Sequence, residues 1–474
     1  MQSDPNGRIV PLIVAVSLFM ENMDSTVIAT SLPAIARALG TEPLALKLAV
    51  TSYLLSLAIC IPASGWTADR FGPRNVFRIA IGIFIIGSIG CALSHSLEEF
   101  VMARIVQGMG GAMMTPVGRL IMVRSIDKQQ LLNAMSLLTM PALIGPICGP
   151  PLGGFITTYA SWHWIFLINV PIGLIGIALA TRFIANTRIE RHDPFDFVGF
   201  VLSGLGIGGL AFGLSVMGLD FLPAGVVGTL IAVGAVSAAA YVVHARRTAA
   251  PILDLSLLKL PTFRASIYGG FMFRLGIGAL PFLLPLLLQI GFGLSPLQSG
   301  LITFTSALGS MFMKAAVGTV LKRFGYRNVL IYNSLISSVF LAACASFVPG
   351  MPYAAMIAIL LAGGFFRSLQ FTSINTIAYA EIDPPLMSRA TALVAAAQQL
   401  SLSTGVAVGA LVVELTLRLK HEPAMTAADF PPAFLAIAVL AASAALVFMR
   451  LKPEAGAELA GRKAAEAVVA DQRS

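Results

Sequence analysis

The chain has 474 residues, of which 57% are hydrophobic and only 11% are charged. An ordinary soluble protein has roughly 25% charged residues, so this composition excludes a soluble globular protein and indicates a membrane protein. A net charge of +9 would suggest nucleic-acid binding in a soluble chain, but here we interpret it as the charge of membrane-flanking loops in contact with anionic lipids.

Fourteen apolar runs of about 20 residues or more follow one another along the chain, separated by short polar loops. A helix of that length crosses the ~30 Å hydrocarbon core of a bilayer. Most Lys and Arg residues outside the runs lie in loops on the side of the two termini, which predicts that both termini are cytoplasmic. We expect the spans at 9–32, 44–66, 76–94, 99–123, 131–158, 164–186, 197–218, 222–244, 263–291, 296–320, 328–349, 352–379, 388–414 and 430–450.

One seven-residue phrase occurs twice. Arg70-Phe-Gly-Pro-Arg-Asn-Val76 recurs as Arg323-Phe-Gly-Tyr-Arg-Asn-Val329, at an offset of 253 residues. The glycine doublets Gly110-Gly111 and Gly363-Gly364 have the same offset. The chain is therefore interpreted as a duplicated half, an organisation typical of membrane transporters.

The offset is longer than six consecutive helices require, and the excess fits a pair of helices at 197–218 and 222–244. The predicted fold class is an all-α membrane protein with two six-helix bundles and an inserted two-helix hairpin. The predicted domains are an N-terminal bundle at 1–187, the hairpin with its connectors at 188–261, a C-terminal bundle at 262–451 and a cytoplasmic tail at 452–474.

Five motifs occur in a fixed order along the chain. They are Asp24-Ser-Thr-Val-Ile-Ala-Thr-Ser-Leu-Pro33, Gly65-Trp-Thr-Ala-Asp-Arg-Phe-Gly-Pro-Arg74, Arg104-Ile-Val-Gln-Gly-Met-Gly110, Gly145-Pro-Ile-Cys-Gly-Pro-Pro-Leu-Gly-Gly154 and Trp162-His-Trp-Ile-Phe-Leu-Ile-Asn-Val-Pro171. Together they resemble the signatures of the major facilitator superfamily, and of its fourteen-helix drug:proton antiporter branch. The resemblance covers residues 9–450. It implies a multi-pass transporter of the bacterial inner membrane that exports small molecules by alternating access.

The repeated phrase also has a physical interpretation of its own. Charged residues flank a glycine that permits a tight turn between two helices, so they can pair with the cytoplasmic ends of neighbouring helices and hold one conformation. The alternative is a solvated basic loop. The second copy has Lys322 where the first has Asp69, so the two copies are not equivalent. The predicted latch residues are Asp69, Arg70, Gly72, Arg74, Arg323 and Arg327.

The fifth predicted helix carries glycines and prolines at close to i, i+4 spacing. This pattern removes side chains from one face, which allows a neighbouring helix to approach and the helix to bend. A gating role follows from the resemblance, and ordinary small-residue packing is the alternative. The residues are Gly145, Pro146, Gly149, Pro150, Gly153 and Gly154.

Three charged residues of the first half lie within predicted spans. Glu21 and Asp24 share one face of the first helix, and Arg104 lies at a similar depth on the fourth. Either carboxylate could pair with Arg104. Burial favours the protonated carboxyl and the arginine favours the ionised one, so a change in their separation would change proton affinity. We expect Asp24, Glu21 and Arg104 to couple transport to protons, with a static ion pair as the alternative.

The second half instead carries embedded cations. Arg274 occupies the position equivalent to Glu21, and Lys314 and Arg367 lie within later spans with no carboxylate at matching depth. These cations would suit a carboxylate or phosphate group, although Lys314 could also extend to the membrane surface. The predicted substrate-cavity residues are Arg274, Lys314, Arg367, Gln107, Gln398 and Gln399.

Two transport functions remain open on the residues alone. One is proton-driven export of drugs, and the other is proton-driven export of small anionic metabolites such as polycarboxylates or their metal chelates. A passive channel is a more remote alternative. The five histidines form no catalytic or metal-binding motif and there is no nucleotide-binding loop, so we expect no enzyme activity, cofactor or bound metal, and an ion gradient as the energy source. The expected partners are a small-molecule substrate, protons and membrane lipids, with no nucleic acid and no obligate protein partner.

Overall fold

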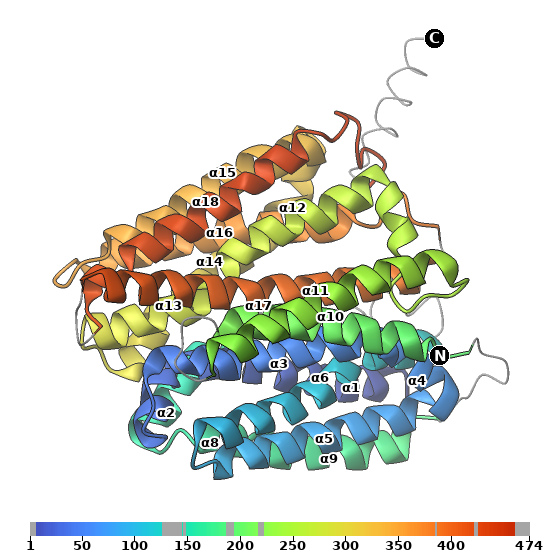
Figure 1. Cartoon of the computed structure of the whole chain (residues 1–474), viewed down its shortest axis with the longest axis horizontal. Helices are drawn as coiled ribbons and strands as arrows, with labels where there is room; N and C mark the ends of the chain where they lie inside the picture. Colours follow the sequence, from blue (N-terminus) through green and yellow to red (C-terminus); the bar gives the residue numbers. More distant parts are fainter. Residues whose placement is uncertain are drawn as a thin grey trace. The chain divides into compact units, whose positions relative to one another are not determined.

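The computed structural model describes residues 6–125, 145, 148–185, 194–216, 222–383, 386–420 and 425–459. All regular secondary structure in these ranges is helical (Figure 1). Contacts divide the chain into two compact units. Unit 1 comprises residues 1–252 and 284–304, and unit 2 comprises residues 253–283 and 305–474.

Unit 1 contains ten named helices. They are α1 (Asn6–Val27), α2 (Leu32–Ala38), α3 (Lys47–Cys60), α4 (Ser64–Phe71), α5 (Pro73–Leu93), α6 (Leu97–Ser125), α8 (Trp164–Leu167), α9 (Asn169–Phe183), α10 (Phe197–Val216) and α11 (Ala224–Arg247). Residues 148–159 form a further helical stretch. Helix α6 packs against α1, α3 and α5, and α9 packs against α1 and α5. This arrangement brings residues far apart in the sequence to one place.

Unit 2 is built from the second half of the chain. Its helices are α12 (Pro261–Gly278), α14 (Pro296–Phe324), which begins in unit 1, α15 (Tyr326–Ala343), α16 (Tyr353–Ile377), α17 (Met387–Lys420) and α18 (Pro431–Phe448). Helix α13 (Leu280–Leu286) continues α12 into a π-turn at Leu287–Gly291 that follows Pro285. Helix α12 packs against α16, α17 and α18, while α15 packs against α16 and α18.

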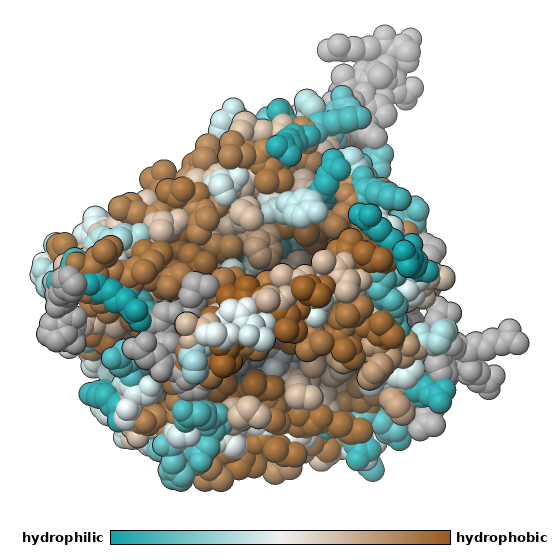
Figure 2. All heavy atoms as spheres, viewed as in Figure 1, coloured by the Kyte–Doolittle hydropathy of each residue, from teal (hydrophilic) through white to brown (hydrophobic). Residues whose placement is uncertain are grey.

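Within the described residues, twelve helical segments are long and apolar enough to cross a membrane. They correspond to twelve of the fourteen predicted spans. Of the other two, 99–123 lies inside α6, and 131–158 lies largely outside the described residues. Figure 2 shows hydrophobic side chains over much of the visible face, and Val226, Val233, Val236 and Val243 of α11 are exposed. Exposed apolar side chains on spanning helices are suited to contact with lipid.

The inserted helices form a hairpin that packs on α3. Glycines bring α10 and α11 together: a Cβ added at Gly209 would lie 2.8 Å from the Cα of Gly234, and one at Gly206 would lie 3.0 Å from the amide nitrogen of Ala238. Such close backbone approach is typical of membrane helix pairs.

Asp196 joins the two ends of this hairpin. Its carboxylate accepts hydrogen bonds from the backbone amides of Gly199, at 2.8 Å, and Ile252, at 3.1 Å, and lies 2.7 Å from His244 Nε2. Burial alone would raise the pKa of Asp196, but the bonds from His244 and the two amides outweigh it, so the pKa lies below its ordinary value. The entry and exit of the hairpin are therefore held by one ionised side chain.

Candidate functional site

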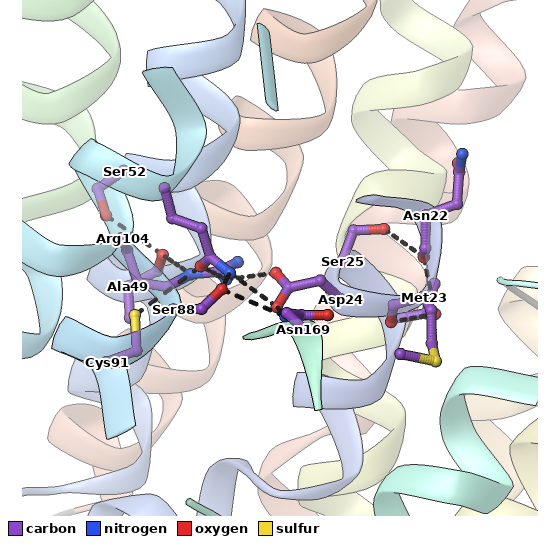
Figure 3. Close-up of polar contacts among 12 residues, drawn as sticks. Asn22, Met23, Asp24, Ser25, Ala49, Ser52, Ser88, Cys91, Arg104 and Asn169 are labelled. Atoms are coloured by element: carbon purple, nitrogen blue, oxygen red, sulfur yellow. Dashed lines mark hydrogen bonds and ion pairs between the residues drawn. The ribbon is translucent and has the colours of Figure 1, made fainter. Parts of the chain in front are cut away.

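The candidate site is centred on Asp24 of α1, whose side chain is fully buried (Figure 3). Its Oδ2 atom lies 2.7 Å from Arg104 Nη1 in a salt bridge. Its Oδ1 atom accepts hydrogen bonds from Gln107 Nε2, at 2.8 Å, and from Asn169 Nδ2, at 2.9 Å. Both carboxylate oxygens are thus satisfied by donors, one of which carries a compensating positive charge.

The donors converge on Asp24 because of where they lie on their helices. Arg104 and Gln107 are three residues apart and share one face of α6. Asn169 is the first residue of α9. Ser88 of α5 links two of the donors, since its Oγ atom accepts from Gln107 at 2.8 Å and from Asn169 at 3.3 Å. The network therefore connects α1, α5, α6 and α9.

Arg104 is almost completely buried, with 1% of its side chain exposed. Its guanidinium carbon lies 4.1 Å from the centre of the Tyr53 ring, which supplies a cation–π contact from α3. Among the described residues, the Tyr53 hydroxyl has no hydrogen-bond partner. Arg104 also lies 5.9 Å from the centre of the Phe166 ring and donates to Gln107 Oε1, so it is held by the Asp24 carboxylate, an amide oxygen and two aromatic rings.

Glu21 is not part of this network. Its Oε2 atom accepts a hydrogen bond of 2.6 Å from Thr115 Oγ1, which lies about three helical turns beyond Arg104 on nearly the same face of α6. The sequence left open which carboxylate would pair with Arg104, and the structure pairs Asp24. Glu21 lies near Gly111, where an added Cβ would be 3.7 Å from the Glu21 Cγ atom.

Gln107 is a partner of Asp24 in the structure. The sequence placed it in the substrate cavity, whereas the structure buries it completely and directs its amide to Asp24 and Ser88. The physical reason is its position three residues after Arg104, which turns both side chains towards the same carboxylate.

Arg274 of α12 was predicted to be exposed to a cavity. In the structure only 1% of it is exposed. Its Nη2 atom donates to Asn375 Oδ1 at 2.6 Å, and its guanidinium carbon lies 5.7 Å from the centre of the Phe371 ring. These α16 side chains enclose it. No carboxylate of the described chain forms a salt bridge with Arg274. Its guanidinium is contacted by a neutral amide and a ring face, and its charge is not balanced by an anion.

The other predicted cavity residues all belong to unit 2. Lys314 is exposed on α14 and donates to Thr372 Oγ1 at 3.2 Å. Arg367 of α16 donates to Ser306 Oγ and lines a small cavity inside unit 2. Gln398 and Gln399 are half-buried on α17. Lys314 and Arg274 thus contact the same turn of α16, at Thr372 and Asn375, whereas Arg367 contacts α14 at Ser306.

The repeated phrase makes one contact twice. Gly72 (φ 86°) and Gly325 (φ 75°) each form a turn that only glycine adopts readily, between α4 and α5 and between α14 and α15. Two residues later, Arg74 Nη1 donates to the carbonyl of Ile184 at 3.4 Å, and Arg327 Nη2 donates to that of Met449 at 3.3 Å.

Both acceptors immediately follow the last helix of their half, since Ile184 follows α9 and Met449 follows α18. An arginine at a helix C-terminus interacts favourably with the carbonyl groups there. Asp69 is half-buried, whereas Arg70 and Arg323 are exposed. The two copies of the phrase differ at Asp69 and Lys322, but the arginine contact is present in both halves.

The glycines predicted on the fifth span lie against α1. A Cβ added at Gly145 would be 3.1 Å from the amide nitrogen of Met23, and one at Gly153 would be 2.3 Å from the carbonyl oxygen of Val27. Gly149 would meet the side chain of Thr26. The carbonyl of Pro150 accepts from Thr30 Oγ1 at 3.4 Å. The small-residue face therefore does permit close helix approach, while Pro146 lies outside the described residues.

The opposite side of this stretch meets the start of α14 within unit 1. A Cβ added at Gly154 would lie 2.5 Å from the carbonyl oxygen of Pro296, and one at Gly300 would lie 2.3 Å from that of Pro150. Glycines on both helices are needed for this approach.

Replacing Gly153 with Ala is expected to destabilise the protein. The new methyl group would collide with backbone, which cannot move aside cheaply, and overpacking of this kind costs about 1–3 kcal/mol or more. The measurement is thermal unfolding in detergent. Gly228→Ala in α11 is the matched control, because nothing lies within 4 Å of its Cβ position. Equal unfolding temperatures for the two variants would contradict the packing described here.

The comparisons with known proteins agree with this geometry. The family model described as Major Facilitator Superfamily matches residues 14–257 and 267–473. The chain belongs to this superfamily, as its motifs predicted, and it is a membrane transporter rather than an enzyme. Its predicted all-helical class and multi-pass membrane character are likewise confirmed.

The curated relatives include proteins named "Putative multidrug resistance protein MdtD". That of Pectobacterium atrosepticum is 39% identical over 93% of this chain and 95% of the relative. That of Klebsiella pneumoniae subsp. pneumoniae is 39% identical over 95% of this chain and 96% of the relative, and that of Escherichia coli O6:H1 is 40% identical over 93% of each.

Solved structures share the fold at much lower identity. A D-xylose–proton symporter has a TM-score of 0.66 and 16% identity, over 94% of this chain and 98% of that one. The human organic anion transporter MFSD10 has a TM-score of 0.62 and 15% identity, over 94% of this chain and all of that one.

Two functional residues were missed in the sequence. Ser88 lies in an apolar run, where a serine is not distinguished from other small residues, and Asn169 was noted only as part of a motif. The signal that could have found Asn169 is its place inside a spanning segment, where a polar amide is costly without a partner.

Proposed function

We propose that this transporter is a proton-coupled antiporter that exports small molecules across the bacterial inner membrane by alternating access. The observation that carries the proposal is the buried Asp24–Arg104 pair with its neutral donors Gln107 and Asn169. Ionisable residues inside a membrane are costly and usually functional. The proposed carrier has fourteen helices with cytoplasmic termini, and uses the proton gradient without a cofactor.

The coupling step is a change of charge at Asp24. The ionised carboxylate attracts the Arg104 guanidinium 2.7 Å away. Protonation would remove that attraction and one hydrogen-bond acceptor, leaving Arg104 with the Tyr53 ring and its remaining polar neighbours. Because α1 and α6 carry the two charges, their packing would depend on whether Asp24 holds a proton. Protons entering from outside would then favour one arrangement, and release to the cytoplasm the other.

The two arginine contacts of the repeated phrase would serve as the conformational latch. Arg74 and Arg327 each secure a helix start to the end of the last helix of its half. The close approach of residues 149–154 to α1 would transmit motion between α1, which holds Asp24, and this helix. Both roles follow the superfamily's motifs.

The substrate class is proposed first as drugs, by analogy with the names of the MdtD relatives. A second candidate is a small anionic metabolite, such as a polycarboxylate or its chelate. The observation that favours it is Arg274, a buried cation that forms no salt bridge with any described carboxylate. In an arrangement that moves the α16 side chains away from Arg274, a substrate carboxylate or phosphate would balance that charge.

Transport by the full-length protein in proteoliposomes tests both candidates. With an acidic interior, we expect saturable accumulation of a fluorescent cationic dye that ends when a protonophore is added. Accumulation of di- or tricarboxylates instead, lost in Arg274→Gln, would support the second candidate. Flux that does not saturate and does not respond to the pH gradient would indicate a passive channel and contradict both.

A further inference from the structure

Unit 2 contains a small cavity between α12, α14, α15 and α16, of about 20 Å³. A cavity needs ~10–15 Å³ by the same measure to hold one water molecule, so this one has room for a single water-sized occupant. Its polar lining consists of Arg367, Ser306, Ser337 and Cys344, and its remaining walls are apolar or glycine.

The polar groups that line the cavity can all donate. Arg367 donates one hydrogen bond to Ser306 Oγ, which leaves the Ser306 hydroxyl proton available to an acceptor. The Ser337 side chain is only 5% exposed, and its Oγ atom has no hydrogen-bond partner in the described chain. Cys344 instead directs its thiol to the carbonyl of Phe340 in its own helix, at 3.6 Å. No carboxylate lines the cavity.

The charge of Arg367 also favours an anion as the occupant of this cavity. It lies within the spanning helix α16, and no described carboxylate forms a salt bridge with it, in contrast to the pairing of Arg104 with Asp24. Arg367 is half-buried, and a charge that is partly removed from water without a counter-charge is unfavourable. A single anion beside Arg367 would balance that charge, and the same anion would accept from the unpartnered Ser337 hydroxyl.

We propose that Arg367, Ser306 and Ser337 bind a small inorganic anion of the size of chloride in this cavity. A monatomic anion suits this small space with its three donors better than sulfate or a carboxylate, which carry several oxygens that each need a donor. Because Ser306, Ser337 and Arg367 lie on α14, α15 and α16, the ion adds a contact to α15 beside the hydrogen bond that already joins Arg367 of α16 to Ser306 of α14. The site is separate from the proposed proton site in unit 1.

Thermal unfolding of the purified full-length protein in detergent tests this. Sodium chloride is titrated against sodium gluconate at constant ionic strength, and we expect the unfolding temperature to rise saturably with chloride or bromide. In Ser337→Ala, the half-saturating chloride concentration should increase about tenfold or more, because a hydrogen bond to a charged group is lost.

Ser338→Ala is the matched control. Ser338 is on the same helix and also 5% exposed, but its hydroxyl donates to the Ser334 carbonyl at 2.7 Å and does not line the cavity. It should keep the wild-type response. In Arg367→Gln, the unfolding temperature should no longer rise with chloride. If that variant does not fold, the comparison of Ser337→Ala with Ser338→Ala tests the proposal.

Identical unfolding temperatures in chloride and gluconate would overturn the proposal and leave a water molecule as the occupant. Equal shifts of half-saturation in Ser337→Ala and Ser338→Ala would overturn it as well. So would a response to sulfate as large as that to chloride.

Discussion

Replacement of Asp24 with Asn is expected to reduce pH-driven uphill transport to the level of protein-free liposomes. Asn has the same shape, but it cannot be ionised, and its amide group cannot reproduce the 2.7 Å salt bridge to Arg104. Downhill exchange of substrate, which needs no proton, should continue in the same vesicles. The measurement is accumulation with and without a pH gradient.

Glu21→Gln is the matched comparison on the same helix. Glu21 accepts one hydrogen bond from Thr115 and makes none to Arg104, so its neutral variant should still respond to the gradient. Both variants remove one carboxylate from α1 and differ only in which network is affected. Uphill transport that survives in Asp24→Asn would show that Asp24 does not carry the proton.

Removal of Arg104 is expected to have the largest effect on stability. Arg104→Gln leaves the fully buried Asp24 carboxylate without its counter-charge, and breaking a buried pair in this way costs about 3–5 kcal/mol. The double variant Asp24→Asn, Arg104→Gln removes both charges and should recover most of that stability, while it remains unable to couple transport to protons. Unfolding in detergent, compared across the three variants, measures the coupling between the residues.

Arg119→Gln provides the control for this series. Arg119 is also on α6, but it is exposed, so its removal should change the unfolding free energy by less than about 1 kcal/mol. A double variant as unstable as Arg104→Gln would mean that Asp24 and Arg104 contribute to the free energy of unfolding independently of each other. The interpretation of the network as a proton switch would then fail.

The sequence predicted the site to the extent that its residues are charged. A carboxylate and an arginine in apolar runs are conspicuous, and Asp24 and Arg104 were found for that reason. Neutral members were not: Ser88 resembles any small residue of a membrane helix, and Gln107 was predicted as a substrate-cavity residue and not as a partner of Asp24. Side-chain direction, rather than residue type, gives Gln107 its partner.

The fold was predicted well where the pattern repeats. The two copies of the phrase at Arg70 and Arg323 predicted helix turns that the structure forms at Gly72 and Gly325. The π-turn at Leu287–Gly291 was not predicted, because a local change of helical hydrogen bonding leaves hydropathy unaltered. The burial of Arg274 was also missed, since its enclosure depends on α16 side chains about 100 residues away.

The structure sharpens the contrast between the two halves. The first contains a buried charge pair, in which Asp24 balances Arg104. The second contains Arg274 and Arg367, which form no salt bridge with a described carboxylate. The two halves nevertheless share a glycine turn and an arginine contact, at Arg74 and Arg327.

Proton release on substrate binding tests the central claim most directly. Substrate is added to the detergent-solubilised protein in weakly buffered solution, and the pH change is followed for the wild type and for Asp24→Asn. If proton and substrate exclude each other through Asp24, the wild type releases protons in proportion to bound substrate and the variant releases none. Equal release from both proteins, or substrate binding by the wild type without any release, would contradict the proposed coupling.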